Sequence, residues 1–302
     1  MNCNEECNDN NDVLKIGVLS LQGAFEEHQE IMETLGCKTI QVKKAEQLNF
    51  IDGLILPGGE STAMGLIGNG EMWVALKEFI NSGKATWGTC AGLILLSESC
   101  VGGSAVIENG QSLVGGMDVL VCRNYFGSQI SSFEMPTPCP PGADDIGSYP
   151  GVFIRAPAIL SAGPDVHVLG KVVATPCRQA AAVLRELDRK IASGEKVVMM
   201  GVVDALDRDA ENHIQMNNLT TTAEISCEGQ VENSVFGEEK KETTMEEIKI
   251  RLPGAIVGTN AREVICAVRK NNILGTAFHP ELTKDYRWHE YFLDMVKSKF
   301  IK

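Results

Sequence analysis

Apolar positions along the first hundred residues switch repeatedly between the spacing of strands and the spacing of helices. Residues 13–20 form a mostly apolar run of strand length, whereas residues 23–35 carry apolar side chains at helical spacing and end at Gly36. On this basis we predict strands at 13–20, 39–42, 53–57 and 85–89, and helices at 23–35, 71–80 and directly after residue 90. Strands that alternate with helices build a mostly parallel sheet covered on both faces, which makes a three-layer α/β domain.

The rest of the chain continues this pattern after a less regular middle part. Residues 115–169 are predicted as further strands and loops, with a rigid, proline-rich connection at 136–141. The remaining predicted elements are a helix at 179–192, strands at 197–203, 263–269 and 273–278, and a closing helix at 285–299. We therefore interpret residues 13–302 as a single domain.

Composition changes this picture in two segments that are too polar to pack. Residues 1–12 are rich in Asn, Asp and Glu and have no apolar core, which predicts a flexible tail rather than a secretory signal. Residues 206–250 hold 11 acidic and four basic side chains, an excess of seven negative charges within a net charge of −13 for the chain. Because few large apolar residues accompany them, this segment is predicted to be a mobile acidic loop.

The charge and the cysteines exclude several functional classes. A formal charge of −13 argues against a general nucleic-acid binder, which needs a basic face. The longest apolar stretches, such as residues 197–203, are strand-sized, so we expect no membrane segment and a soluble, cytoplasmic protein. The ten cysteines include no pair at zinc-knuckle spacing, and most are expected to be reduced, buried side chains that bind no metal.

One cysteine has a different setting, between a predicted strand and a predicted helix. In Gly88-Thr89-Cys90-Ala91-Gly92, the two glycines relieve crowding around a sharp turn that would expose the Cys90 side chain. The N-terminus of the following helix favours a thiolate at this position. The pattern indicates a nucleophile, and the alternative is a packed structural cysteine beside a glycine turn.

The candidate base for this nucleophile is His279. A thiolate that attacks a carbonyl needs a base and a further group to orient that base, and Phe278-His279-Pro280-Glu281 supplies both. In an extended segment, residues two apart point the same way, so Glu281 can hold the far nitrogen of His279. The other four histidines lack such a setting and are predicted to be surface or core residues: His28, His167, His213 and His289.

A pair of glycines after the third predicted strand is the candidate oxyanion hole. Gly58 and Gly59 leave backbone N–H groups bare enough to approach a ligand oxygen. A phosphate-binding loop is the alternative interpretation. The surrounding residues, 56–62, lack the Gly-Lys-Ser/Thr ending of such a loop and any nearby lysine.

Together, these three motifs resemble the class I, triad-type glutamine amidotransferases. The finer likeness is to the glutaminase subunit of pyridoxal 5′-phosphate synthase, and it extends over six separated segments: 21–28, 52–62, 87–94, 123–129, 151–157 and 276–283. It covers about residues 13–170 and 263–300. The resemblance implies a flavodoxin-like, three-layer α/β fold with an insertion at about 171–262, where shorter members of the family pass quickly from one strand to the next.

The resemblance also implies a role for each matching residue. Cys90 would be the nucleophile, His279 the general base and acid, and Glu281 the group that orients it. The oxyanion would lie against backbone N–H groups of Gly58, Gly59 and Ala91, and glutamine against Glu60, Ser61, Arg123, Arg155 and Ala156. A zwitterionic amino acid needs one anion and one cation from the protein, and Glu60 and Arg123 supply that pair. Gln22 would lie near the partner surface and couple docking to the oxyanion loop.

The implied activity is hydrolysis of L-glutamine to L-glutamate and ammonia, through a cysteinyl thioester and without a metal or organic cofactor in this chain. Ammonia would pass to a docked (β/α)₈-barrel subunit that builds pyridoxal 5′-phosphate, a form of vitamin B6, from a pentose phosphate and a triose phosphate. Three alternatives stay open: a glutaminase subunit that serves another synthase, a non-catalytic regulatory or scaffolding subunit, and a redox-sensing cysteine protein of similar architecture.

Overall fold

The computed structural model describes residues 13–68, 70–102, 113–127, 132–143, 147–193, 197–198, 200–201, 222–223 and 252–298. The predicted tail at 1–12 lies outside these residues, as does the predicted acidic loop at 206–250 except for two residues. Those two, Thr222–Ala223, form β13, which pairs with β11 (Val197–Val198). Neither prediction is tested.

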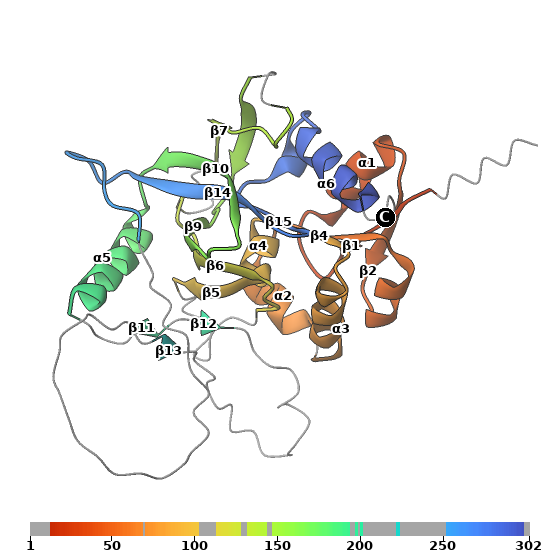
Figure 1. The fold of residues 1–302 in the computed structure, drawn as a ribbon, viewed down its shortest axis with the longest axis horizontal. Helices are drawn as coiled ribbons and strands as arrows, with labels where there is room; N and C mark the ends of the chain where they lie inside the picture. Colours follow the sequence, from red (N-terminus) through yellow and green to blue (C-terminus); the bar gives the residue numbers. More distant parts are fainter. Residues whose placement is uncertain are drawn as a thin grey trace, which may run out of the picture.

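The strands that carry the predicted site lie side by side in one large sheet and are parallel (Figure 1). Their order across the sheet is β2 (Lys38–Val42), β1 (Lys15–Leu19), β3 (Gly53–Leu56), β4 (Ala85–Thr89) and β15 (Ile273–Thr276). Side chains on these strands, such as Ile16, Leu54, Trp87 and Leu274, are fully buried, as expected for strands covered on both faces. The carboxyl ends of these strands meet at one edge, so the loops that follow them lie close together.

The other half of the sheet is mixed in direction. β14 (Arg262–Lys270) runs antiparallel to β15, β9 (Ala158–Ala162) and β10 (His167–Ala174). β6 (Met117–Cys122) pairs antiparallel with β9 and parallel with β5 (Ser97–Val101), which in turn pairs antiparallel with β12 (Met200–Gly201). The sequence predicted several of these strands but not their direction. A tight turn at Asn271, with φ of 53°, reverses the chain between β14 and β15 and makes that pair antiparallel.

Helices cover both faces of the parallel strands, which confirms the predicted α/β architecture. Figure 1 shows α1 (Phe25–Thr34) and α6 (Arg287–Lys297) close together on one side of these strands and α3 (Gly70–Asn81) on the other. α4 (Ala91–Leu96) begins directly after Cys90, as predicted. None of the described helices combines the length and apolar character needed to cross a membrane.

Two short helical elements were not predicted. η1 (Ala45–Phe50) is a single 3₁₀ stretch, and α2 (Ser61–Ile67) is a seven-residue helix that follows the glycine pair. Both are too short to show a helical repeat in the sequence. α2 is instead held at its start, where the Glu60 carboxylate accepts hydrogen bonds from the backbone N–H groups of Thr62 and Ala63.

The predicted insertion contains one long helix, and there the prediction is confirmed. α5 (Arg178–Ser193) matches the predicted helix at 179–192 to within one residue at each end. The single strand predicted at 197–203 is wrong, because the described residues of this segment form the short strands β11 and β12 in two different sheets. A third sheet pairs β7 (Phe133–Thr137) antiparallel with β8 (Tyr149–Phe153).

Candidate active site

Cys90 lies in the strained turn that the sequence predicted, between β4 and α4. Its backbone has φ of 47° and ψ of −100°, a region that side-chain-bearing residues rarely adopt. The turn is packed so closely that a Cβ on Gly92 would lie 2.0 Å from the carbonyl oxygen of Leu56. The Cys90 N–H donates to the carbonyl of Thr276 at 2.8 Å, which fixes Cys90 to the neighbouring strand β15.

His279 and Glu281 follow β15 and are hydrogen-bonded to each other, as predicted. His279 Nδ1 lies 2.7 Å from Glu281 Oε1, and both side chains are buried. The predicted local geometry was wrong, because residues Pro280–Leu282 form the 3₁₀ turn η5 rather than an extended segment. The contact between His279 and Glu281 still forms. Pro280 occupies the first position of the turn, so His279 lies just before the turn, where its backbone N–H donates to the Val152 carbonyl at 2.8 Å.

The electrostatics of this pair fit a base that shares its proton with a thiol. Burial opposes a charge on His279, but the Cys90 thiolate, and then the Glu281 carboxylate, raise its pKa well above the usual value of 6.5. Burial alone would raise the pKa of Glu281, but the positive charge that His28 and His279 carry when protonated outweighs burial and lowers it. The site therefore favours a protonated His279 imidazole with an ionised Glu281 carboxylate behind it.

Sequence reasoning missed a second histidine beside Glu281. His28, on α1, is fully buried, and its Nε2 lies 3.4 Å from Glu281 Oε2 and 3.3 Å from Thr89 Oγ1. Its Nδ1 lies 2.9 Å from Nε2 of His289, on α6. The sequence predicted that these histidines are surface or core residues, which is correct: His28 and His289 are buried, and His167 is exposed. The sequence did not predict that His28 lies beside the site. His213 lies outside the described residues. A contact between residues 261 positions apart leaves no local signal in a single sequence.

The candidate oxyanion loop is held by the loop that follows β1. The Gly58 carbonyl accepts from Ala24 N–H at 2.9 Å, so the N–H of Gly59 in the same planar trans peptide points the opposite way. Gln22 Oε1 accepts from Glu60 N–H at 2.7 Å, which places Gln22 against the loop. A Cβ on Gly58 would lie 2.4 Å from Cε1 of His279, so the loop packs directly on the imidazole. At α4, the first-turn N–H groups, including that of Ala91, add donors near Cys90.

Arg123 and Glu60 lie together beside this loop. Arg123 Nη2 lies 3.7 Å from Glu60 Oε1 and donates to Thr62 Oγ1 at 3.0 Å. The Arg123 side chain is only 6% exposed, and its Nε has no partner among the described residues. A buried cation with an unused N–H is a natural binding group for a carboxylate.

The other residues predicted to hold glutamine fall into two groups. Ser61 is buried at the start of α2, next to Glu60. Arg155, with φ of 47°, and Ala156 lie between β8 and β9. The Ala156 carbonyl accepts from Phe126 N–H at 3.2 Å, which packs this turn against the one that carries Arg123.

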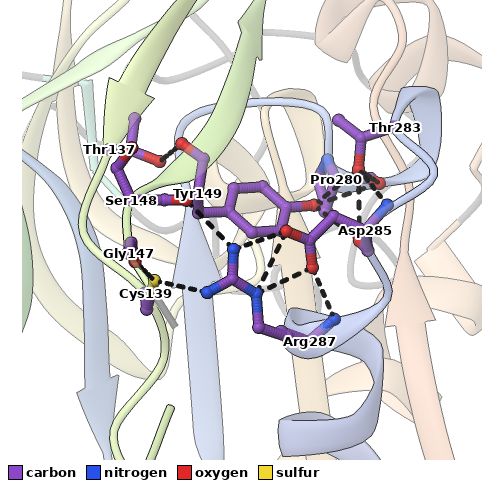
Figure 2. Close-up of polar contacts among 9 residues, drawn as sticks. All are labelled: Thr137, Cys139, Gly147, Ser148, Tyr149, Pro280, Thr283, Asp285 and Arg287. Atoms are coloured by element: carbon purple, nitrogen blue, oxygen red, sulfur yellow. Dashed lines mark hydrogen bonds and ion pairs between the residues drawn. The ribbon is translucent and has the colours of Figure 1, made fainter. Parts of the chain in front are cut away.

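Hydrogen bonds from Tyr149 and Arg287, which we call the polar clamp, hold the segment that follows His279. Figure 2 shows Tyr149 of β8 pointing its hydroxyl at this segment, 3.3 Å from the Pro280 carbonyl, 3.0 Å from Thr283 Oγ1 and 3.1 Å from the Asp285 carbonyl. Arg287 pairs with Asp285 and donates to Cys139 Sγ at 2.8 Å and to the Ser148 carbonyl at 3.0 Å (Figure 2). These contacts tie the loop that follows His279 to the β7–β8 pair.

Replacement of Tyr149 by phenylalanine tests the clamp. The variant should lose about 0.5–1.5 kcal/mol of unfolding free energy, because the Tyr149 hydroxyl no longer donates to the Pro280 or Asp285 carbonyl, which then keep only their contacts with Thr283. Urea unfolding measures this loss. Tyr291→Phe is the matched control, since its hydroxyl accepts from Arg269 away from this loop. Equal stability of Tyr149→Phe and the wild type would show that the clamp contributes nothing.

Comparisons with known proteins found relatives that match most of this chain. The SNO glutamine amidotransferase family matches residues 18–183. A probable pyridoxal 5′-phosphate synthase subunit PDX2 of Arabidopsis thaliana is 37% identical over 289 residues, which cover 94% of this chain and 87% of the relative. The pyridoxal 5′-phosphate synthase subunit PdxT of a Geobacillus species is 35% identical, over 95% of this chain and 98% of that protein. A crystal structure of a glutamine amidotransferase superposes with a TM-score of 0.57 and 27% identity, over 93% of this chain and 98% of that one.

Proposed function

Because this chain belongs to the SNO glutamine amidotransferase family, we propose that it is the glutaminase subunit of a pyridoxal 5′-phosphate synthase, with Cys90, His279 and Glu281 as its catalytic triad. The observation that carries the residue assignment is the strained Cys90 turn beside a buried His279–Glu281 pair. Relatives that align with nearly the whole chain carry the name of the synthase subunit, which supports the destination of the ammonia.

The first half of the cycle forms a thioester. The Cys90 thiolate attacks the side-chain amide carbon of glutamine, a C–S bond forms, and the carbonyl oxygen becomes an oxyanion. Backbone N–H groups of Gly59 and Ala91 stabilise that oxyanion. The His279 imidazolium then gives its proton to the departing nitrogen, the C–N bond breaks, and ammonia leaves.

The second half regenerates the thiolate. Water attacks the γ-glutamyl thioester while His279, now neutral, takes one of its protons. The C–S bond breaks, glutamate forms, and the thiolate and imidazolium are restored. Glu281 stays ionised throughout and holds the imidazole in place.

The substrate would be held by charge at both ends of its backbone. Arg123, with its unused Nε, would bind the α-carboxylate of glutamine, and Glu60 would bind the α-ammonium. Ser61, Arg155 and Ala156 would complete the pocket. In the absence of substrate, the two charged residues partly neutralise each other across 3.7 Å.

Three of the buried cysteines give no support to the redox-sensing alternative. Burial raises the pKa of the Cys100, Cys122 and Cys266 thiols to about 12. Such thiols are protonated at neutral pH and react slowly with oxidants.

Glutamate release with and without a synthase subunit tests the proposed function. The partner proposed is a (β/α)₈-barrel subunit, and Gln22, which touches the oxyanion loop, would transmit its docking. We expect slow release by the chain alone and faster release once the synthase subunit is added. A chain that releases no glutamate in either condition would overturn the proposal.

Replacement of Arg123 by methionine tests the substrate site. The loss of a charge-assisted carboxylate contact, about 1.5–3 kcal/mol, should raise the KM for glutamine about 10- to 100-fold and change kcat much less. Steady-state kinetics measure this split. Arg269→Met, which removes an arginine that pairs with Tyr291 outside the site, is the control. An unchanged KM in Arg123→Met would remove Arg123 from the pocket.

A further inference from the structure

The Glu281 carboxylate lies between two imidazoles, and the triad uses only one of them. His279 Nδ1 is 2.7 Å from Oε1, and His28 Nε2 is 3.4 Å from Oε2. The side chains of His28 and Glu281 are both inaccessible to solvent. Oε2 has no hydrogen-bond partner among the described residues, and the imidazole nitrogen that faces it, His28 Nε2, is hydrogen-bonded to Thr89 Oγ1 at 3.3 Å.

These contacts define one consistent arrangement of protons. An ionised carboxylate only accepts hydrogen bonds, so the nitrogen that faces it, His28 Nε2, must carry a proton. Burial lowers the pKa of His28 below 6.5, against the opposing pull of Glu281, so the ring is neutral and its Nδ1 is bare. Nδ1 must then accept, and the donor 2.9 Å away is Nε2–H of His289. His289 Nδ1, left without a proton, has no partner among the described residues, which costs less for an acceptor than for a donor.

We propose that His28, set in its tautomer by His289, is a positioning residue for glutamine hydrolysis. Its Nε2–H donates to Thr89 Oγ1 and faces the Glu281 carboxylate, and so fixes both the strand end that carries Cys90 and the carboxylate behind His279. This inference rests on the proposed function. It adds a second layer to the triad, in which two neutral imidazoles lie behind the acidic residue.

Neutral donors suit this position better than a charged one. The titratable groups that act on His28 are Glu281, His279, Glu27 and the hydrogen-bonded His289. A protonated His28 would neutralise Glu281 and reduce its effect on His279. A neutral N–H instead orients the carboxylate and leaves its charge to act on His279.

Aromatic packing keeps the two histidines in place. The Trp87 ring makes edge-to-face contacts with His28 at 5.6 Å and with His289 at 4.9 Å between ring centroids. Phe292 packs against Trp87 at 5.6 Å, and Trp87 Nε1 donates to Thr276 Oγ1 at 3.2 Å. Trp87 lies on β4 and Phe292 on α6, and their packing leaves the His28 and His289 rings little freedom to rotate.

Two substitutions at residue 28 separate the two ring nitrogens. Asparagine can replace the Nδ1 contact to His289 but cannot reach Glu281, whereas glutamine extends an N–H donor to the Nε2 position. We expect His28→Asn to lower kcat about 10- to 100-fold with a KM for glutamine within twofold, the size typical of residues that orient a functional side chain. His28→Gln should recover most of that loss. His167→Asn, at an exposed position, is the control.

The kinetic result distinguishes positioning from a merely structural role. A structural role predicts that both variants lose activity in step with their melting temperatures. Unchanged kcat in His28→Asn, or equal losses in the two variants, would overturn the proposal. Failure of the wild type to release glutamate with its synthase subunit would instead overturn the proposed function.

The tautomers can be tested in the wild type, even if the variants do not fold. In protein labelled with ¹⁵N-histidine, long-range ¹H–¹⁵N correlations report which ring nitrogen carries the proton. We expect both His28 and His289, assigned through their contacts to the Trp87 ring, to be protonated at Nε2. A proton on Nδ1 of His28 would overturn the proposal, whatever the kinetics show.

Discussion

Replacement of Cys90 by alanine is expected to reduce glutamate release by about 10⁴-fold or more, to the level of background hydrolysis. The reason is that every later step depends on the C–S bond that Cys90 forms. His279, the oxyanion loop and the substrate-binding charges remain in this variant, but none of them offers a nucleophile of comparable strength. Alanine also suits the buried turn, since Cys90 is 5% exposed and only its sulfur is removed.

The measurement is glutamate release in the presence of the synthase subunit, with circular dichroism to confirm the fold. Cys37→Ala is the matched control, because Cys37 is also a buried cysteine but lies after α1, away from the site. In parallel, a γ-glutamyl chloroketone should alkylate one residue in the wild type and none in Cys90→Ala. Substantial turnover by Cys90→Ala would refute the nucleophile assignment and the mechanism built on it.

The features that could be predicted from the sequence have local physical causes. Cys90 was found because a strained turn between a strand and a helix needs small neighbours, and Gly92 indeed leaves no space for a Cβ against Leu56. His279 and Glu281 were found because two residues that must touch lie two positions apart. The helix at 178–193 was found because its apolar repeat is long enough to be recognised.

The features that were missed depend on distant parts of the chain. The contact of His28 with His289 joins α1 to α6, and nothing near either residue signals the other. The direction of β14 is set by pairing with β9 and β10 as well as β15, which a hydrophobic pattern does not encode. At residues 280–282 the local inference was wrong in geometry, because proline favoured a 3₁₀ turn, yet correct about the contact.

Replacement of Glu281 by glutamine should have the second-largest effect, a fall in kcat of about 10³- to 10⁴-fold. Glutamine fills the same volume, but it removes the charge that supports a protonated His279, and its NH₂ group can present a donor where an acceptor is needed. His279 Nδ1–H and the His28 imidazole, which both lie close to residue 281, would then face a side chain with a single carbonyl oxygen. His279 would lose its orientation, while glutamine binding at Arg123 and Glu60 would be little changed.

The same variant should shift the pH dependence in a defined direction. Burial lowers the pKa of His279, and the Cys90 thiolate and then Glu281 raise it, with the net result well above 6.5. Removing Glu281 takes away part of the upward shift, so the imidazolium that protonates the leaving ammonia is lost at a lower pH. The alkaline limb of the residual kcat profile should therefore move to lower pH in Glu281→Gln.

Glu263→Gln, at an exposed position paired with Lys171, is the control and should leave the profile unchanged. A kcat for Glu281→Gln within tenfold of wild type would mean that His279 is oriented by its backbone contact to Val152 alone, and that neither Glu281 nor the histidines behind it contribute to the reaction.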